Sequence, residues 1–421
     1  MTQTAPDTRP DRPARVPGEA SGREFIALVT ALMAMTALGI DLMLPAFPDI
    51  RAEFGMSADS TQVTWIITAY FLGMAIGPWL FGPASDRYGR RRLVFLGLAL
   101  YVVGSSAAAL STSWELLIVA RFVWGVGASG PRSLAVTIIR DRHEGSTMAR
   151  LMSMIMAVFM LVPIIAPALG AGLIAFLPWR VVFWFPAVMA LVLMVWTRRL
   201  PETLSDHNRR PFTLRSVAGA SREVARHRQT VALTIAMTFL YSMMTSYLAG
   251  SEVILGDVYG YGDWFPLFFG VIAVLLAANS LSNARLVQRL GVVRLLRTQS
   301  LLGVAACVFL FAVSMLNAGV PNFWLFSFGV CLVMPMVQGL SPSSNTAAMT
   351  PLPHVAGTAS AIIATVTTAG GAVLGGIASN AFDGTVRPFA GYFLAFMGCT
   401  AACIWWGTAV ARRTVPHTPT A

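Results

Sequence analysis

Charged side chains are scarce in this sequence, and one basic residue type is missing altogether. Only 12% of the 421 residues are charged and 56% are hydrophobic, and all 30 basic residues are arginine because the chain has no lysine. Soluble globular domains are about 25% charged. The composition therefore excludes a soluble fold and predicts a protein that crosses a membrane many times.

Cysteine and histidine are also few. The four cysteines, Cys307, Cys331, Cys399 and Cys403, all lie in apolar runs of the C-terminal half, where a thiol ordinarily serves as a small packing group. No disulfide framework is indicated. The five histidines lie in predicted loops or in the C-terminal tail, so we expect no metal site and no cofactor.

Apolar runs account for most of the chain. A helix needs about 20 apolar residues to cross a bilayer, and twelve runs of that kind can be counted. We therefore expect an all-α membrane protein with twelve transmembrane helices in two pseudo-symmetric six-helix bundles. The predicted domains are a disordered cytoplasmic tail (1–23), an N-terminal six-helix bundle (24–199), a cytoplasmic linker (200–229), a C-terminal six-helix bundle (230–411) and a second cytoplasmic tail (412–421).

The arginines are distributed unevenly between the loops. With the N-terminus placed inside, 25 arginines lie on the cytoplasmic side, three lie on the other side, and Arg121 and Arg132 fall within a span. Such a bias sets membrane orientation. It predicts cytoplasmic termini in a bacterial inner membrane, with lipids and not nucleic acid as the partner of the basic residues.

Among the charged residues inside predicted spans, the most informative are Asp41 in the first and Arg121 in the fourth. An ionised group at the bilayer centre costs about 2.5–3.5 kcal/mol on insertion scales, so such groups normally face a cavity or a partner. Because burial favours the neutral acid, Asp41 is suited to bind and release a proton. Alternatively, Asp41 lies in water at the outer headgroup level and Arg121 extends to the outer interface.

The segment between the second and third spans carries a distinctive charge pattern. It reads Gly-Pro-Ala-Ser-Asp-Arg-Tyr-Gly-Arg-Arg-Arg from Gly82 to Arg92. This segment resembles the signature loop of the major facilitator superfamily, which implies the major facilitator fold, a monomer and a cytoplasmic gate. The matching gate residues are Gly82, Asp86, Arg87, Gly89, Arg90 and Arg91.

A weaker copy of this segment follows 202 residues later. The shift places Arg87 on Arg289 and Gly89 on Gly291, while Asp86 falls on a glutamine. A repeat of this period in a chain of twelve spans indicates two related halves with a binding site between them near the midplane.

The fifth span contains two prolines four residues apart, Pro163 and Pro167, followed by Gly170. Proline removes a backbone donor and kinks a helix. Together with a Gly-x-Asp-x-x-x-Pro pattern in the first span, this element resembles the drug:proton antiporters, and among them the bicyclomycin and chloramphenicol exporters. The resemblance implies that Asp41 carries the coupling proton, that Arg121 belongs to the same polar network, and that the proline element seals the cavity.

Aromatic and sulfur-containing side chains are frequent in the spans. Flat and flexible apolar groups suit a cavity that accepts varied ligands, although most such residues in a helical bundle are ordinary packing. The predicted substrate cavity comprises Asp41, Tyr70, Phe159, Met160, Tyr241 and Gln338.

These features predict a proton-coupled antiporter that exports small hydrophobic drugs or toxic compounds by alternating access. The alternative is a proton-coupled importer, or an exporter dedicated to one metabolite, on the same fold. A membrane enzyme is not expected, because acid–base or metal chemistry needs clustered acids. The acids of the outer loops show no paired spacing: Asp49, Glu53, Asp257 and Asp263.

Overall fold

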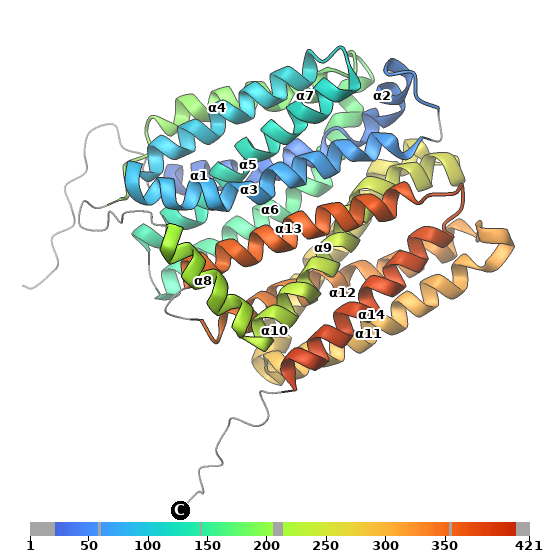
Figure 1. Cartoon of the computed structure of the whole chain (residues 1–421). Coiled ribbons are helices and arrows are strands. Elements are labelled where there is room, and N and C mark those ends of the chain that lie inside the picture. Colours follow the sequence, from blue (N-terminus) through green and yellow to red (C-terminus); the bar gives the residue numbers. More distant parts are fainter. Residues whose placement is uncertain (1–21, 58–59, 144, 205–213, 353–355, 410–421) are drawn as a thin grey trace, which may run out of the picture.

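The computed structural model describes residues 22–57, 60–143, 145–204, 214–352 and 356–409. In this part of the chain, twelve long helices form two groups of six, which lie on opposite sides of the molecule in Figure 1. The first group is α1 (Gly22–Asp41), α3 (Trp65–Tyr88), α4 (Arg90–Ala109), α5 (Trp114–Arg142), α6 (Gly145–Ile174) and α7 (Val181–Thr197). The second group is α9 (Arg228–Val253), α10 (Phe265–Leu290), α11 (Val292–Ser314), α12 (Phe323–Met349), α13 (Ala356–Asn380) and α14 (Arg387–Thr408).

Two short helices complete the described chain. After α1 ends at Asp41, a 3-10 turn containing Pro45 leads into α2 (Phe47–Glu53). One continuous apolar run from about Phe25 to Phe47 predicts a single span, whereas in the structure α1 ends within this run and the turn before α2 follows it. Helix α8 (Leu214–Arg226) lies in the linker between the halves.

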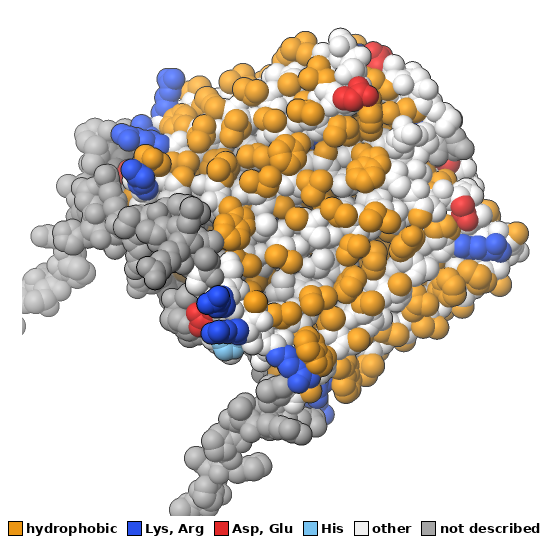
Figure 2. Space-filling view, viewed as in Figure 1, with side chains coloured by type: hydrophobic (Ala, Val, Ile, Leu, Met, Phe, Trp, Pro, Cys, Tyr) orange, Lys and Arg blue, Asp and Glu red, His pale blue; other side chains and the backbone are white. Residues whose placement is uncertain are grey.

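The surface is that of a protein surrounded by lipid. Among the described residues, nine helical stretches are long and apolar enough to cross a bilayer, and two shorter apolar helices accompany them. Figure 2 shows hydrophobic side chains over the middle of the visible face, with arginines at the end near α8 and acids at the other end. An apolar surface this extensive requires a membrane. The chain is a multi-pass membrane protein.

The two halves meet along two helix pairs. Helix α3 packs against α13, beside which it lies in Figure 1, and α6 packs against α10. Contact along the first pair is close: the hydroxyl of Thr365 donates to the carbonyl of Ala75 at 2.8 Å, and a Cβ on Gly376 would lie 2.7 Å from the Thr68 hydroxyl. The space between the halves is therefore bordered on two sides by helices in direct contact.

The internal repeat predicted from the sequence is also present in the backbone conformation. Gly89 separates α3 from α4 with φ +100°, and Gly291 separates α10 from α11 with φ +75°. Both values lie in the region that glycine adopts without a steric cost. The second half has thus kept the tight turn between its second and third helices.

Candidate functional site

Asp41 ends α1 inside the protein. The residue is 3% exposed, which argues against the alternative in which it is solvated at the membrane surface. Among the described residues, no hydrogen bond or ion pair reaches its carboxyl group. Tyr70 of the first half and Tyr247 of the second half both lie within electrostatic range of it. The acid is therefore positioned between the two halves, without a built-in counter-ion in the described part of the chain.

Arg121 of α5 is fully buried and holds the end of α1. Its Nη1 donates to the carbonyl of Gly39 at 2.9 Å, and its Nε donates to the carbonyl of Ile66 at 3.2 Å. The guanidinium also lies 4.5 Å from the ring centroids of Tyr70 and Trp124, a cation–π geometry. Its Nη2 has no partner among the described residues. The arginine does not extend to the membrane surface and forms no ion pair with the acid two residues beyond Gly39.

Two tyrosines fix the same turn of α1. The hydroxyls of Tyr70 and Tyr101 donate to main-chain carbonyls of α1 at 3.1 and 2.9 Å, and both rings lie edge-on to Trp124. A Cβ on Gly39 would lie 2.8 and 3.0 Å from the two hydroxyl oxygens. The glycine therefore permits the close approach that holds the acid-bearing end of α1.

The proline element of α6 packs beside the acid. A Cβ on Gly170 would lie only 2.0 Å from the carbonyl oxygen of Leu42, the residue after Asp41. Pro167 is buried and Pro163 is half-buried within the helix. The element predicted to seal the cavity is thus in backbone contact with the segment that carries the acid.

The other predicted cavity residues are divided. Tyr241 of α9 lies across the boundary between the halves from Phe71 of α3, with ring centroids 5.4 Å apart. Gln338 of α12 is half-buried and has no hydrogen bond within the described part of the chain. The side chains of Phe159 and Met160 lie outside the described residues.

Arg132 is a central residue to which the sequence assigned no role. It follows Arg121 by eleven residues, about three helical turns, so both lie on one face of α5. Its guanidinium lies within electrostatic range of Tyr241 in the other half and of Tyr70. Its signal in the sequence was the cost of a charge within a span, the same signal that identified Arg121.

The 82–92 segment forms a compact ionic network at the end of the bundle opposite α2. Arg90 pairs with Asp86 one turn earlier and, through Nε, with Asp141 of α5 at 3.1 Å. Glu202, which follows α7, accepts hydrogen bonds from the backbone N–H of Arg90 at 2.8 Å. A carboxylate is favoured at a helix N-terminus, and a Cβ on Gly89 would come within 2.5 Å of it. Glu202 gave no signal in the sequence.

The remaining predicted gate residues contribute less. Arg91 donates only its backbone N–H to Glu202, at 3.2 Å. Arg87 is exposed and stacks on the neighbouring Tyr88 ring, and Gly82 has open space beside it. In the described part of the chain, this network joins helix ends within the first half and does not reach the second.

At the opposite end, which we call the outer end, charged residues do join the halves. Arg51 of α2 lies 3.3 Å from the carboxylate of Glu252 in α9 and 3.8 Å from that of Asp257. Its Nε also donates to the carbonyl of Ser60 at 3.1 Å. We call Arg51, Glu252 and Asp257 the outer charge cluster. Sequence reasoning missed it because 201 residues separate the paired side chains.

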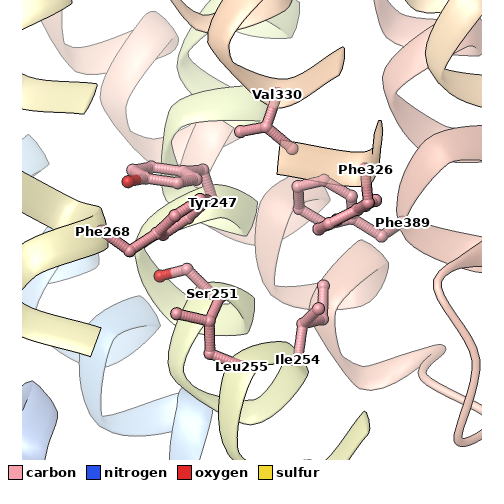
Figure 3. Close-up of a pocket in the computed structure, with 8 residues that line it drawn as sticks. All are labelled: Tyr247, Ser251, Ile254, Leu255, Phe268, Phe326, Val330 and Phe389. Carbon is pink, nitrogen blue, oxygen red and sulfur yellow. The ribbon is translucent and has the colours of Figure 1, made fainter. Parts of the chain in front are cut away.

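One cavity within the second half is small. Side chains of α9, α10, α12 and α14, among them Tyr247, Ser251, Phe268, Phe326 and Phe389, converge on one cavity (Figure 3). Its volume is about 10 Å³, roughly that needed for one water molecule, so it is a packing void and not a substrate site. Among the described residues, no three metal-ligating side chains gather to hold a metal ion.

Known proteins resemble this chain over most of its length. A family model described as Major Facilitator Superfamily matches residues 29–376. A bicyclomycin resistance protein homolog of Haemophilus influenzae is 26% identical, covering 86% of this chain and 91% of that protein. The multidrug resistance protein MdtL of Shewanella oneidensis is 28% identical, covering 79% and 82%.

Solved structures agree on the fold. A D-xylose–proton symporter superposes with a TM-score of 0.72 at 14% identity, covering 91% of this chain and 97% of that one. The human organic anion transporter MFSD10 gives a TM-score of 0.66 at 20% identity, covering 93% and 100%. At these identities the likeness concerns architecture alone.

Proposed function

The chain belongs to the major facilitator superfamily, and from this premise we propose that it is a proton-coupled antiporter that exports small hydrophobic compounds. The relatives named for resistance to bicyclomycin, chloramphenicol and multiple drugs support export over import. The substrate is a small molecule, and protons are the coupling ion.

The observation that carries the proposal is the position of Asp41. It is buried at the end of α1, between the halves, and no described residue neutralises its charge. In such surroundings the neutral, protonated carboxyl group is favoured over the charged carboxylate. The acid can therefore take up a proton and release it when water reaches it. Arg121 and the two tyrosines hold the backbone of α1 at this point, so the acid has a fixed place when the halves move.

The cycle follows from alternating access between two bundles. When the outer end opens, Asp41 takes up a proton from outside. When the inner end opens, it releases the proton and the substrate enters the same cavity. The network around Arg90 keeps the inner ends of the first half together as a rigid unit during both movements.

The test is substrate uptake driven by a proton gradient in proteoliposomes containing the purified chain. With chloramphenicol and ethidium as probes, an imposed pH gradient should drive uptake in the wild type. Asp41→Asn should abolish this uptake and leave insertion intact, whereas Asp49→Asn, an exposed acid of α2, should behave as the wild type. Gradient-driven transport by Asp41→Asn at the wild-type rate would remove the mechanism.

The location and the oligomeric state complete the proposal. Arginines gather at the end of the molecule near α8, which by the positive-inside rule supports a cytoplasmic location of the linker and both termini. The protein then functions as a monomer in a bacterial inner membrane. A C-terminal alkaline phosphatase fusion should be inactive, and a C-terminal fluorescent protein fusion should be bright.

A further inference from the structure

The outer charge cluster crosses the boundary between the halves. Arg51 belongs to α2 in the first half, whereas Glu252 lies in the last turn of α9 and Asp257 in the π-helical turn that follows (Ile254–Val258). Opening of the outer end must therefore separate Arg51 from both acids. A neighbouring pair, Arg180 and Glu53 at 2.8 Å, lies wholly in the first half and is not affected by opening.

The pair at the centre of the cluster is shielded from water. The side chains of Arg51 and Glu252 are 3% and 6% exposed, whereas that of Asp257 is 25% exposed. Coulombic attraction is stronger where water is excluded, so the contact between Arg51 and Glu252 contributes more than the longer contact with Asp257. A cavity of about 390 Å³, lined by all three residues among others, adjoins the cluster.

Both acids of the cluster face the same arginine. Repulsion between the acids acts within the second half and does not oppose closure. The attraction across the boundary is the sum of two contacts, and protonation of Glu252 removes the nearer and more buried one.

We propose that Glu252 is a second proton-binding residue of this exporter and that its ionised form closes the outer end through Arg51. Proton binding at Glu252 releases the outer end, so external acid admits protons towards Asp41. By linkage, opening must in turn strengthen proton binding at Glu252. The reason is that opening moves the positive charge of Arg51, which opposes proton binding, away from the acid. This inference deepens the proposed function and rests on it.

Two further described contacts at the outer boundary are neutral. The hydroxyl of Thr61 and the side chain of Asn380 lie 3.3 Å apart, as do the hydroxyls of Ser379 and Thr64. Hydroxyl and amide groups do not titrate in the physiological range. Arg51 and Asp257 are the charged groups that act on Glu252, so any pH dependence of opening is assigned to this cluster.

The experiment measures opening directly, in the full-length chain with its four cysteines replaced. Ser379→Cys places a buried thiol at the outer boundary, and its labelling rate by an impermeant maleimide in intact cells reports opening. Rates are divided by those of Thr112→Cys, an exposed outer position, to remove the intrinsic pH dependence of the thiol. The normalised rate should rise by about tenfold when the external pH falls from 7.5 to 5.5.

Three variants separate the proposal from a merely structural role. Glu252→Gln, which mimics the protonated acid, should label about tenfold faster at pH 7.5 and lose the pH dependence. Asp257→Asn should label only slightly faster and keep it. Glu53→Gln, which breaks the pair with Arg180 inside one half, should label at the same rate as the Ser379→Cys protein without a further substitution. An unchanged pH profile in Glu252→Gln, or an equal effect of Glu53→Gln, would overturn the proposal.

The labelling result does not depend on transport. If Asp41→Asn abolishes proton-driven transport and Glu252→Gln leaves the labelling profile unchanged, the inference about Glu252 fails and the antiporter stands. If Asp41→Asn transports normally, the antiporter fails whatever the labelling shows. The two experiments therefore have distinguishable failures.

Discussion

Replacing Gly39 by alanine tests whether the end of α1 is held as tightly as the structure indicates. The added Cβ would lie 2.8 Å from the Tyr70 hydroxyl, 3.0 Å from the Tyr101 hydroxyl and 3.3 Å from the Trp124 ring. All three belong to buried side chains, so none can move into free space. The methyl group must displace side chains that also hydrogen-bond to α1.

The magnitude follows from three contributions. Overpacking in a filled interior costs about 1–3 kcal/mol, and each displaced tyrosine hydrogen bond costs about 1 kcal/mol. Replacement of glycine by alanine in a helix returns about 1 kcal/mol. The net destabilisation should be about 2–4 kcal/mol, and proton-coupled transport should fall because Asp41, two residues later, shifts with the backbone.

The assay is thermal unfolding in detergent, followed by gradient-driven uptake in proteoliposomes. The matched control is Gly398→Ala in α14, where a Cβ would meet nothing within 4 Å. The control should unfold at or slightly above the wild-type temperature and transport normally. If Gly39→Ala is as stable and as active as this control, then α1 is not packed as described and the site has been misplaced.

Three further substitutions test other contacts of the site. Gly170→Ala should abolish transport, because its Cβ would lie 2.0 Å from the Leu42 carbonyl, whereas Gly172→Ala, with open space, should remain active in the same uptake assay. Gly89→Ala should lower the unfolding temperature more than Gly291→Ala, since both positions need positive φ but only Gly89 faces the Glu202 carboxylate. Equal losses would contradict the close contact between Glu202 and the start of α4. Asp86→Ala should retain substrate binding by equilibrium titration and slow turnover, because it releases Arg90 from one of its two acids; a turnover rate equal to that of the wild type would remove the role of the network.

The candidate site residues that the sequence identified share one property. Each is a residue type that would be unfavourable, or that is specifically required, at its position in the apolar pattern. Asp41 and Arg121 were visible because a charge inside an apolar run is expensive unless it serves a purpose. Gly89 and its copy Gly291 were visible because a sharp turn between two helices needs glycine. The same argument applied to Arg132, although no partner for it could be named from the sequence.

Partners across the chain were not visible. Glu202 clamps the start of α4 from 112 residues away, and Arg51 meets Glu252 from 201 residues away. Each of these residues lies near a helix end, where a charged residue is common and therefore does not indicate a functional role. The prediction of one continuous first span also missed the turn after Asp41, since hydropathy does not register where a helix changes direction.

The sequence alone determined that this protein spans a membrane, that it consists of two related halves, and that an acid lies in the apolar run of the first helix, because burial costs and backbone sterics are local and leave marks in the residue pattern. Only the tertiary structure decided which side chains face one another across the halves, and hence which charges are paired and which have no counter-ion among the described residues. Electrostatic pairing depends on distance in space, which the order of residues along the chain does not record.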